Sequence, residues 1–276
     1  MKSTSSAKIH YRRGEAENAA KILSAVDEHL TKLTEKLAVS LPYTPQLYLT
    51  TSQEEFDRIT GGFLPQWSQG VSSAMSGQIV LKSPSFSKNI ATVKQTAVHE
   101  LTHLFIAQKA GHGVPRWLNE GLAQLLAGQG QGEPLLPISR AMWAGKLIPL
   151  SDIDFVDRMT HKDAELAYLQ SFNAVEFLVQ DYGWEAMRDL LSALGQNSTP
   201  DEAFSQVYLF DQAGFESIWL QHLQKSHRWM ILLDTQLYIF SGATILVLLS
   251  GIAILRKRRK IYKKWESEEN SYTGTI

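Results

Sequence analysis

The sequence predicts an α+β fold in which strands dominate the first part of the chain, helices dominate the second, and one transmembrane helix follows. Three observations predict this order. Residues 63–82 look strand-rich with glycine turns, helical periodicity prevails from Val93 onward, and residues 235–255 carry no charge. The chain has 276 residues, 44% hydrophobic and 20% charged, which suits one globular domain of about 200 residues or more with an ample core.

The N-terminal elements follow from periodicity and capping signals. After a polar tail over residues 1–8, residues 15–39 are predicted to form an amphipathic helix, because their apolar side chains recur at helical spacing. Residues 43–50 have the pattern of a strand. Ser52 and Glu55 then form a capping box, which predicts a short helix before the next glycine pair.

Residues 92–110 are predicted to form the helix that carries the most informative motif of the chain. The segment has no proline or glycine, its apolar residues recur at helical spacing, and Pro115 prevents its continuation. His99 and His103 are four residues apart and therefore share one face of this helix. Two imidazoles so placed can bind one metal ion, with Glu100 beside them to accept a proton from metal-bound water.

Two histidines do not complete a catalytic zinc site, which usually has three protein ligands. The next candidates along the chain are His112 and Glu120. Glu120 lies in a second predicted helix that runs to about Ala127, and packing of this helix on the first would bring its carboxylate to the histidine pair. Each group also has a simpler interpretation: solvated histidines on an amphipathic helix, and a first-turn carboxylate stabilised by the helix dipole.

Two segments resemble a known family of enzymes. H-E-L-T-H at residues 99–103 and W-L-N-E-G-L-A at residues 117–123 are similar to the gluzincin zinc metallopeptidases, and most closely to small bacterial peptidase-MA-like proteins. The resemblance covers roughly residues 8–225 and implies a zincin-like catalytic domain that binds one Zn²⁺ ion and hydrolyses peptide bonds. The residues that it implies are His99, His103 and Glu120 as zinc ligands and Glu100 as the general base.

The same resemblance directs attention to two further side chains. Related enzymes stabilise the oxyanion with a tyrosine well downstream of the glutamate ligand, and Tyr168, in the predicted helix 164–181, is the candidate; the alternative is a core aromatic residue. Thermolysin-type members carry an aspartate four residues after the glutamate ligand, where it orients a ligand histidine. Here that position is Gln124, which can accept a hydrogen bond but supplies no charge.

The expected partner is a peptide or protein substrate. Residues 78–81 are predicted to form a strand next to the metal helix, either an edge strand on which an extended peptide adds as a further strand, or an interior strand without substrate contact. A net charge of −1 gives no reason to expect nucleic acid binding. The chain has no cysteine, which excludes a disulfide framework without indicating a compartment.

Near the C-terminus, residues 235–255 form a run of 21 uncharged residues, enough to span a bilayer and contact its lipids. Five basic residues follow at 256–260, so the positive-inside rule predicts a single-pass membrane protein with a cytoplasmic tail and an extracytoplasmic catalytic domain. Residues 1–8 contain no signal-peptide core, so we expect either a signal further upstream, which we favour, or a cytoplasmic domain.

These observations predict a membrane-anchored zinc peptidase. The expected layout is a polar tail at 1–8, a peptidase domain at 9–228, a transmembrane helix at 232–255 and a basic tail at 256–276. One alternative is a catalytically degenerate zincin that acts as a membrane-tethered binding or chaperone-like module. Another is a single-pass signalling or scaffold protein with a structural metal, although structural zinc more often has four protein ligands, commonly including cysteine.

Overall fold

The structure is a computed structural model. It describes the whole chain except residues 5, 88, 131–134, 228–234 and 274–276, and the side chains of 227–243 and 264–276 are also outside the description. The chain divides into two compact units, Met1–Lys225 and Ser226–Ile276, and each is described by itself.

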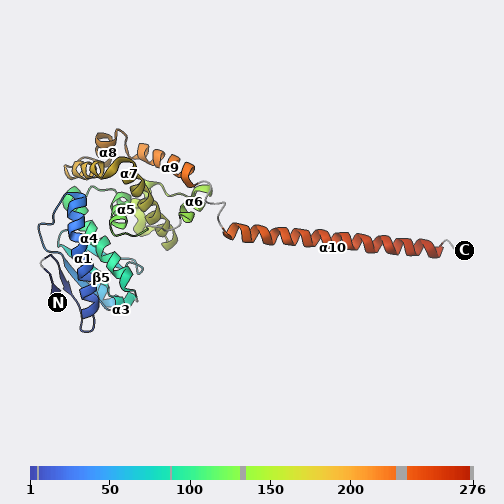
Figure 1. The fold of residues 1–276 in the computed structure, drawn as a ribbon, viewed down its shortest axis with the longest axis horizontal. Helices are drawn as coiled ribbons and strands as arrows, with labels where there is room; N and C mark the ends of the chain where they lie inside the picture. Colours follow the sequence, from blue (N-terminus) through green and yellow to red (C-terminus); the bar gives the residue numbers. More distant parts are fainter. Residues whose placement is uncertain (5, 88, 131–134, 228–234, 274–276) are drawn as a thin grey trace. The chain divides into compact units, whose positions relative to one another are not determined.

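The first unit contains short strands and helices of very different lengths (Figure 1). In chain order they are β1 (Lys2–Ser3), β2 (Lys8–His10), α1 (Ala16–Leu37), β3 (Gln46–Thr50), α2 (Gln53–Thr60), β4 (Gly70–Ser73), β5 (Gln78–Lys82), α3 (Pro84–Ser87), α4 (Ile90–Ala110), α5 (Arg116–Leu126), α6 (Leu136–Trp143), the 3₁₀ segment η1 (Leu150–Arg158), α7 (His161–Gly195), α8 (Pro200–Tyr208) and α9 (Gln212–His227). The second unit contains α10 (Thr235–Thr273).

The described strands form one sheet in the order β1-β2-β3-β5-β4. β2, β3 and β5 pair in parallel, whereas β1 and β4 are antiparallel to their neighbours. α1 joins β2 to β3 and is the crossover connection that a parallel pair requires. Because β5 has β3 on one side and β4 on the other, residues 78–81 form an interior strand, and β4, like β1, lies at an edge of the described sheet.

Two helices cover this sheet and position the site. α1 and α4 contact each other and the strands, and their apolar side chains form one core with those of the sheet. This core includes Ile22 and Val26 of α1, Leu47 and Ile79 of the strands, and Ala97 and Leu101 of α4. α4 is buried on most of its circumference, including the polar residues Thr96, Glu100 and Thr102. Buried polar groups need hydrogen-bond partners, so these side chains of α4 are expected to make specific hydrogen bonds.

The prediction of an α+β fold with a strand-rich N-terminal part is wrong. Most described residues are helical, and no described strand is longer than five residues. The region 63–82, which looked strand-rich, contains only β4 and β5. The physical reason is that helices alternate with strands from the start of the chain: the 22-residue α1 already lies between two parallel strands, so strands and helices are not segregated along the sequence.

The helices that carry the motifs form close to the predicted positions. α4 begins after Asn89, whose side chain accepts hydrogen bonds from the first backbone N–H groups, and it ends at Gly111 in a positive-φ conformation. α5 ends before Gly128, which also has a positive φ. The helix predicted over residues 164–181 is longer in the structure, because α7 continues after a non-helical residue, Gly183, to residue 195.

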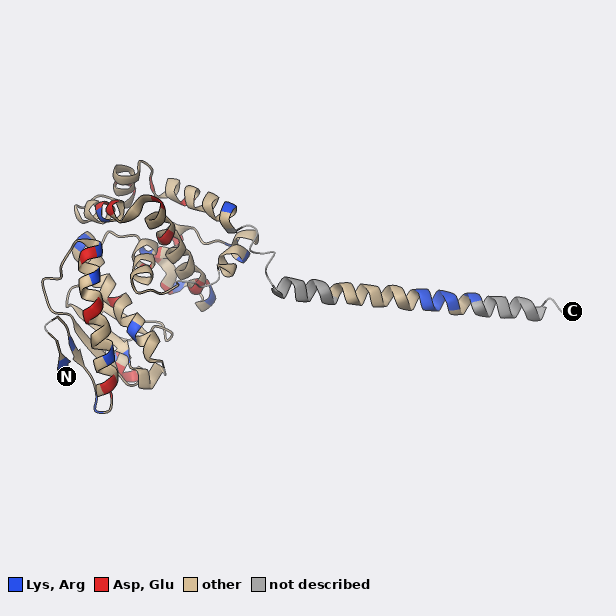
Figure 2. Ribbon diagram, in the orientation of Figure 1, with Lys and Arg blue, Asp and Glu red and all other residues tan. Residues whose placement is uncertain are grey.

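The predicted transmembrane helix over residues 235–255 is contradicted, and with it the single-pass membrane localisation and the lipid contact. Within the part of the chain that the structure describes, no helix has the length and apolar character needed to cross a membrane. The side chains of α10 are described only from Thr244, and from there the uncharged stretch ends at Leu255, before the basic residues 256–260 (Figure 2). Residues 235–243 of the predicted span lie outside the described side chains.

Candidate metal centre

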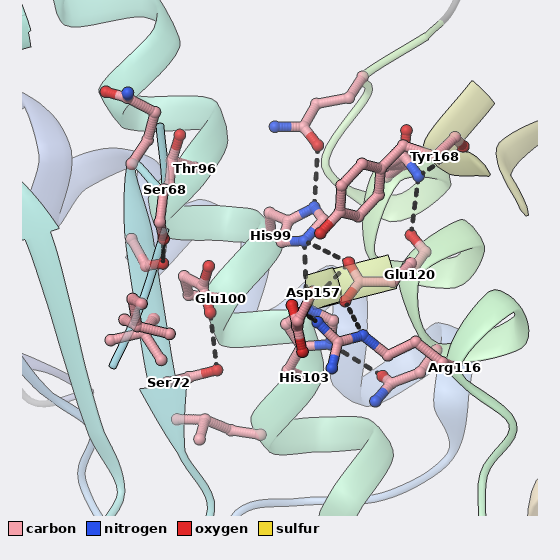
Figure 3. A pocket seen from close by; sticks show the side chains of 18 of the residues that line it. Ser68, Ser72, Thr96, His99, Glu100, His103, Arg116, Glu120, Asp157 and Tyr168 are labelled. Atoms are coloured by element: carbon pink, nitrogen blue, oxygen red, sulfur yellow. Dashed lines mark hydrogen bonds and ion pairs between the residues drawn. The ribbon is translucent and has the colours of Figure 1, made fainter. Parts of the chain in front are cut away.

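A cavity of about 560 Å³ lies where α4, α5 and α7 meet the edge strand β4. Its walls also include the loop that precedes β4, with Trp67 and Ser68, and Asp157 from η1. Figure 3 shows that the polar side chains of these elements point toward a common centre. Residues of both motif segments, 99–103 and 117–123, line this cavity.

Two histidines and one glutamate converge in this cavity. His99 and His103 project from successive turns of α4, and their Nε2 atoms are 3.1 Å apart. From α5, Oε2 of Glu120 lies 3.3 Å from Nε2 of His99 and 3.7 Å from Nε2 of His103 (Figure 3). A tetrahedral zinc ion with bonds of about 2.0–2.1 Å holds its ligand atoms about 3.3 Å apart. The three donor atoms therefore have the spacing and the chemistry of a metal-binding set.

The other nitrogen of each imidazole is held by a side-chain amide. Nδ1 of His99 is 2.9 Å from Oε1 of Gln129, and Nδ1 of His103 is 2.8 Å from Oδ1 of Asn119. An amide oxygen only accepts hydrogen bonds, so in this arrangement each Nδ1 carries a proton and donates. The Nε2 lone pairs are then directed toward each other and toward Glu120, an arrangement that a bound cation would stabilise.

α5 delivers the glutamate because its ends and its packing are fixed. The first backbone N–H of the helix, that of Arg116, donates to Oδ1 of Asp154 at 2.8 Å. Gly121, the residue after the glutamate, lies against α7 so closely that an added Cβ would be 2.3 Å from the backbone oxygen of Ser171. Backbone therefore packs on backbone, which brings Tyr168 of α7 to the same cavity.

The charges around Glu120 favour its ionised form. Burial alone would raise the pKa of Glu120, but the neighbouring His103, His99 and Arg116 lower it to about 2. Nε of Arg116 donates to Oε1 of Glu120 at 2.8 Å, which leaves Oε2 facing the histidines. Burial lowers the pKa of His99, but the hydrogen bond and charge of Glu120 outweigh it and raise that pKa above its usual value.

These shifts predict the pH dependence of the protein after a chelator has removed any metal. The pKa of Glu120 is about 2 when folded against 4.5 normally, so its contribution to stability is complete above pH 4.5 and is lost as the pH falls through about 2. The pKa of His99 is raised above 6.5, so its contribution is complete below pH 6.5 and is lost as the pH rises through the folded value. Urea unfolding is expected to show maximum stability between these limits, and a Glu120→Gln variant is expected to lose both effects. A wild-type profile identical to that of the variant would contradict the prediction.

Glu100, which lies between the two histidines in the sequence of α4, also lines the cavity. It is only 8% exposed, and its Oε2 accepts a hydrogen bond of 2.8 Å from the hydroxyl of Ser72 on β4. Gly70 of the same strand approaches Glu100 so closely that an added Cβ would lie 3.2 Å from its Cγ. The glutamate is thus fixed between α4 and the edge strand, with its carboxylate facing the cavity (Figure 3).

Tyr168 occupies the opposite wall. Its ring meets that of Trp67 edge-to-face, with centroids 6.3 Å apart. Burial and the charge of Glu120 raise the pKa of Tyr168, while the charge of Arg116 and a hydrogen bond from it act in the other direction, and the net shift is upward. The phenol is therefore protonated at neutral pH and can donate a hydrogen bond. Tyr168 lines the cavity and is also partly buried against the hydrophobic core.

Sequence reasoning missed several side chains of the site and expected a different contact for one. Gln124 does not reach a histidine; its Nε2 donates to the backbone oxygens of Glu120 and Tyr168 and so ties α5 to α7. Gln129 makes the hydrogen bond to His99 instead. Its position between two glycines was the signal in the sequence that could have indicated it. His112 lines the cavity but is not part of the metal-binding set.

Comparison with known proteins agrees with the geometry. A protein-family model described as the Peptidase MA superfamily matches residues 25–225. The match therefore includes α4, α5 and the part of α7 that carries Tyr168. No curated protein sequence matches the chain significantly.

Proposed function

Because the chain belongs to the Peptidase MA superfamily, we propose that it is a zinc-dependent peptidase of the gluzincin type. The observation that carries the proposal is the convergence of His99, His103 and Glu120 at zinc-ligand spacing, with Glu100 beside them in the same cavity. A superfamily of peptidases implies peptide or protein substrates. Two imidazoles and one carboxylate are the ligand set of several catalytic zinc sites, which keep the fourth position open for water or substrate.

The proposed roles follow from where each side chain lies. A zinc ion bound at this site would polarise the scissile carbonyl and activate the attacking water. Glu100 accepts the proton of that water and then passes it to the leaving amine, so that one carboxylate serves as base and acid in turn. The hydroxyl of Ser72 donates to Oε2 of Glu100 and so fixes the orientation of the carboxylate. Burial of the carboxylate keeps bulk water from competing for the same proton.

Tyr168 is proposed to stabilise the oxyanion. The phenol of Tyr168 lines the cavity together with Arg116 and Glu120 and is protonated at neutral pH, so its O–H can donate to an oxyanion that forms there. A donor placed where negative charge develops in the transition state contributes to kcat more than to substrate binding.

Tyr168→Phe is therefore expected to lower kcat by about 10²–10³-fold with little change in KM. Steady-state hydrolysis of a cleaved peptide measures both constants. Tyr182→Phe is the matched control, because Tyr182 lies on the same helix but lines a different hollow of the surface. Equal kcat values for the wild type and Tyr168→Phe would remove Tyr168 from the mechanism.

The substrate is proposed to bind as an added strand on β4. Among the described strands, β4 pairs with β5 on one side and has no partner on the other, and it borders the cavity through Gly70, Val71 and Ser72. An extended peptide paired with this edge would place its backbone beside Glu100. The sequence left open whether residues 78–81 take this role or form an interior strand, and the structure places them one strand further inside.

Incubation of the full chain with a library of unstructured peptides, followed by mass spectrometry, tests the proposed activity. We expect new termini to appear, to disappear after treatment with a chelator, and to return when zinc is added back. Zinc binding without cleavage of any peptide would contradict the peptidase and favour the alternative of a degenerate zincin that only binds peptides.

A further inference from the structure

The side chains that support the three proposed ligands share one property: none of them brings a negative charge to its ligand. Gln129 and Asn119 hold the two imidazoles through neutral amide oxygens. Arg116 holds the carboxylate of Glu120 through a cationic guanidinium. A carboxylate hydrogen-bonded to a ligand histidine raises the basicity of the ring, whereas an amide oxygen orients the ring with much less effect on its charge.

Gln129 is held in position by the backbone on both sides. Its N–H donates to the backbone oxygen of Gln124 at 2.9 Å, which continues the end of α5. The flanking glycines, Gly128 and Gly130, both have positive φ values, a conformation that other residues rarely adopt. An added Cβ on Gly130 would lie 3.0 Å from the ring of Phe172. A tight turn packed on the core therefore aims the amide of Gln129 at His99.

We propose that Gln129 is a positioning residue that orients His99, and that its neutral amide keeps the zinc affinity of the site below the affinity that a carboxylate would give. The inference rests on the proposed function and deepens it, because it concerns the regulation of the same site. With a moderate affinity, the zinc occupancy of the protein follows the concentration of available zinc. The activity of the enzyme then depends on zinc supply as well as on substrate.

Two substitutions at this one position are expected to change zinc affinity in opposite directions. Gln129→Ala removes the hydrogen bond and is expected to weaken zinc binding by roughly 10–100-fold. Gln129→Glu keeps the shape of the side chain and adds a charge, and we expect it to tighten zinc binding by roughly 10-fold. Competition of the full-length protein with a chromogenic chelator for zinc measures both affinities. A loss of structure would weaken binding in both variants, so opposite signs identify an electrostatic and positioning effect.

The controls separate this inference from the proposed function. Asn119→Asp makes the same change at His103 and is expected to tighten zinc binding in the same way. Gln69→Glu places an equal charge in the same cavity without contact to a ligand, and we expect a much smaller effect. If Gln129→Ala, Gln129→Glu and Asn119→Asp all bind zinc with the affinity of the wild type, the inference is overturned. The proposed function would still hold if that wild type binds zinc and cleaves peptides. A wild type that binds no zinc would overturn both.

Discussion

Replacing Glu100 with glutamine is expected to abolish peptide hydrolysis and to leave zinc bound. The substitution keeps the size of the side chain, but the amide cannot accept a proton from water at neutral pH. Loss of a general base costs about 10²–10⁴-fold in rate, and here the same carboxylate is proposed to deliver the proton to the leaving group as well. We therefore expect kcat/KM to fall by at least about 10³-fold. Peptide cleavage measured at equal zinc content for wild type and Glu100→Gln tests this.

Glu165→Gln is the matched control for that experiment. Glu165 is an exposed residue of α7, where it contacts His161 of the same helix, and its replacement is expected to leave the rate unchanged. Undiminished hydrolysis by Glu100→Gln would show that another group accepts the proton. A fall of equal size in both variants would show that the effect is not specific to the cavity.

Among the substitutions proposed in the helices that form the site, Gly121→Ala is expected to lower the stability of the protein most. An added Cβ would lie 2.3 Å from the backbone oxygen of Ser171 and 2.5 Å from Cγ2 of Val175, and backbone atoms of α7 cannot move aside cheaply. Overpacking of this kind costs about 1–3 kcal/mol, and in a unit of this size each kcal/mol lowers Tm by roughly 2–4 °C. Thermal unfolding followed by circular dichroism measures the shift.

The added methyl group would also push α5 away from α7. This shift is expected to reduce zinc binding, because it displaces Glu120 from the histidines of α4. Gly113→Ala is the matched control: an alanine there would meet nothing within 4 Å, and the residue has no positive φ. Its Tm and zinc affinity are expected to equal those of the wild type. A wild-type Tm for Gly121→Ala would mean that α5 and α7 are not in backbone contact.

The sequence was most informative where chemistry and local periodicity coincide. His99, Glu100 and His103 belong to one helix, so their common face follows from helical geometry alone. The assignment of Glu120 as a third ligand depended on the resemblance to gluzincins, because no local rule shows which side of α5 meets α4. Local reasoning gave the end of α4 at Ala110 but placed its start at residue 92 instead of Ile90, because the capping side chain of Asn89 was not recognised.

Features that depend on tertiary packing could not be predicted in the same way. β5 pairs with β3 although α2 and β4 lie between them in the sequence, so the order of the strands does not follow from a local pattern. The contacts of Gln129 and Ser72 join segments about 30 residues apart in sequence to α4, so no local pattern marks them. Gln124 was assigned by its offset from Glu120, but its side chain lies on the face of α5 toward α7 and donates to the backbone oxygen of Tyr168 there.

The α+β prediction failed for a related reason. The composition of residues 63–82 favours strands, although most of that region is turns and loops in the structure. Helix α1 was predicted correctly in extent but not recognised as a crossover between parallel strands, which requires knowledge of the pairing of β2 with β3.

The zinc content of the purified full-length chain tests the proposed metal centre most directly. After loading with zinc in solution, elemental analysis is expected to give one zinc per chain for the wild type, and a strongly reduced content for His103→Ala, because that variant lacks one of three ligands. His222→Ala, which changes a histidine of α9 outside the cavity, is expected to retain full zinc content. No zinc in the wild type after loading with zinc in solution, or equal zinc in the wild type and His103→Ala, would contradict a catalytic centre at His99, His103 and Glu120.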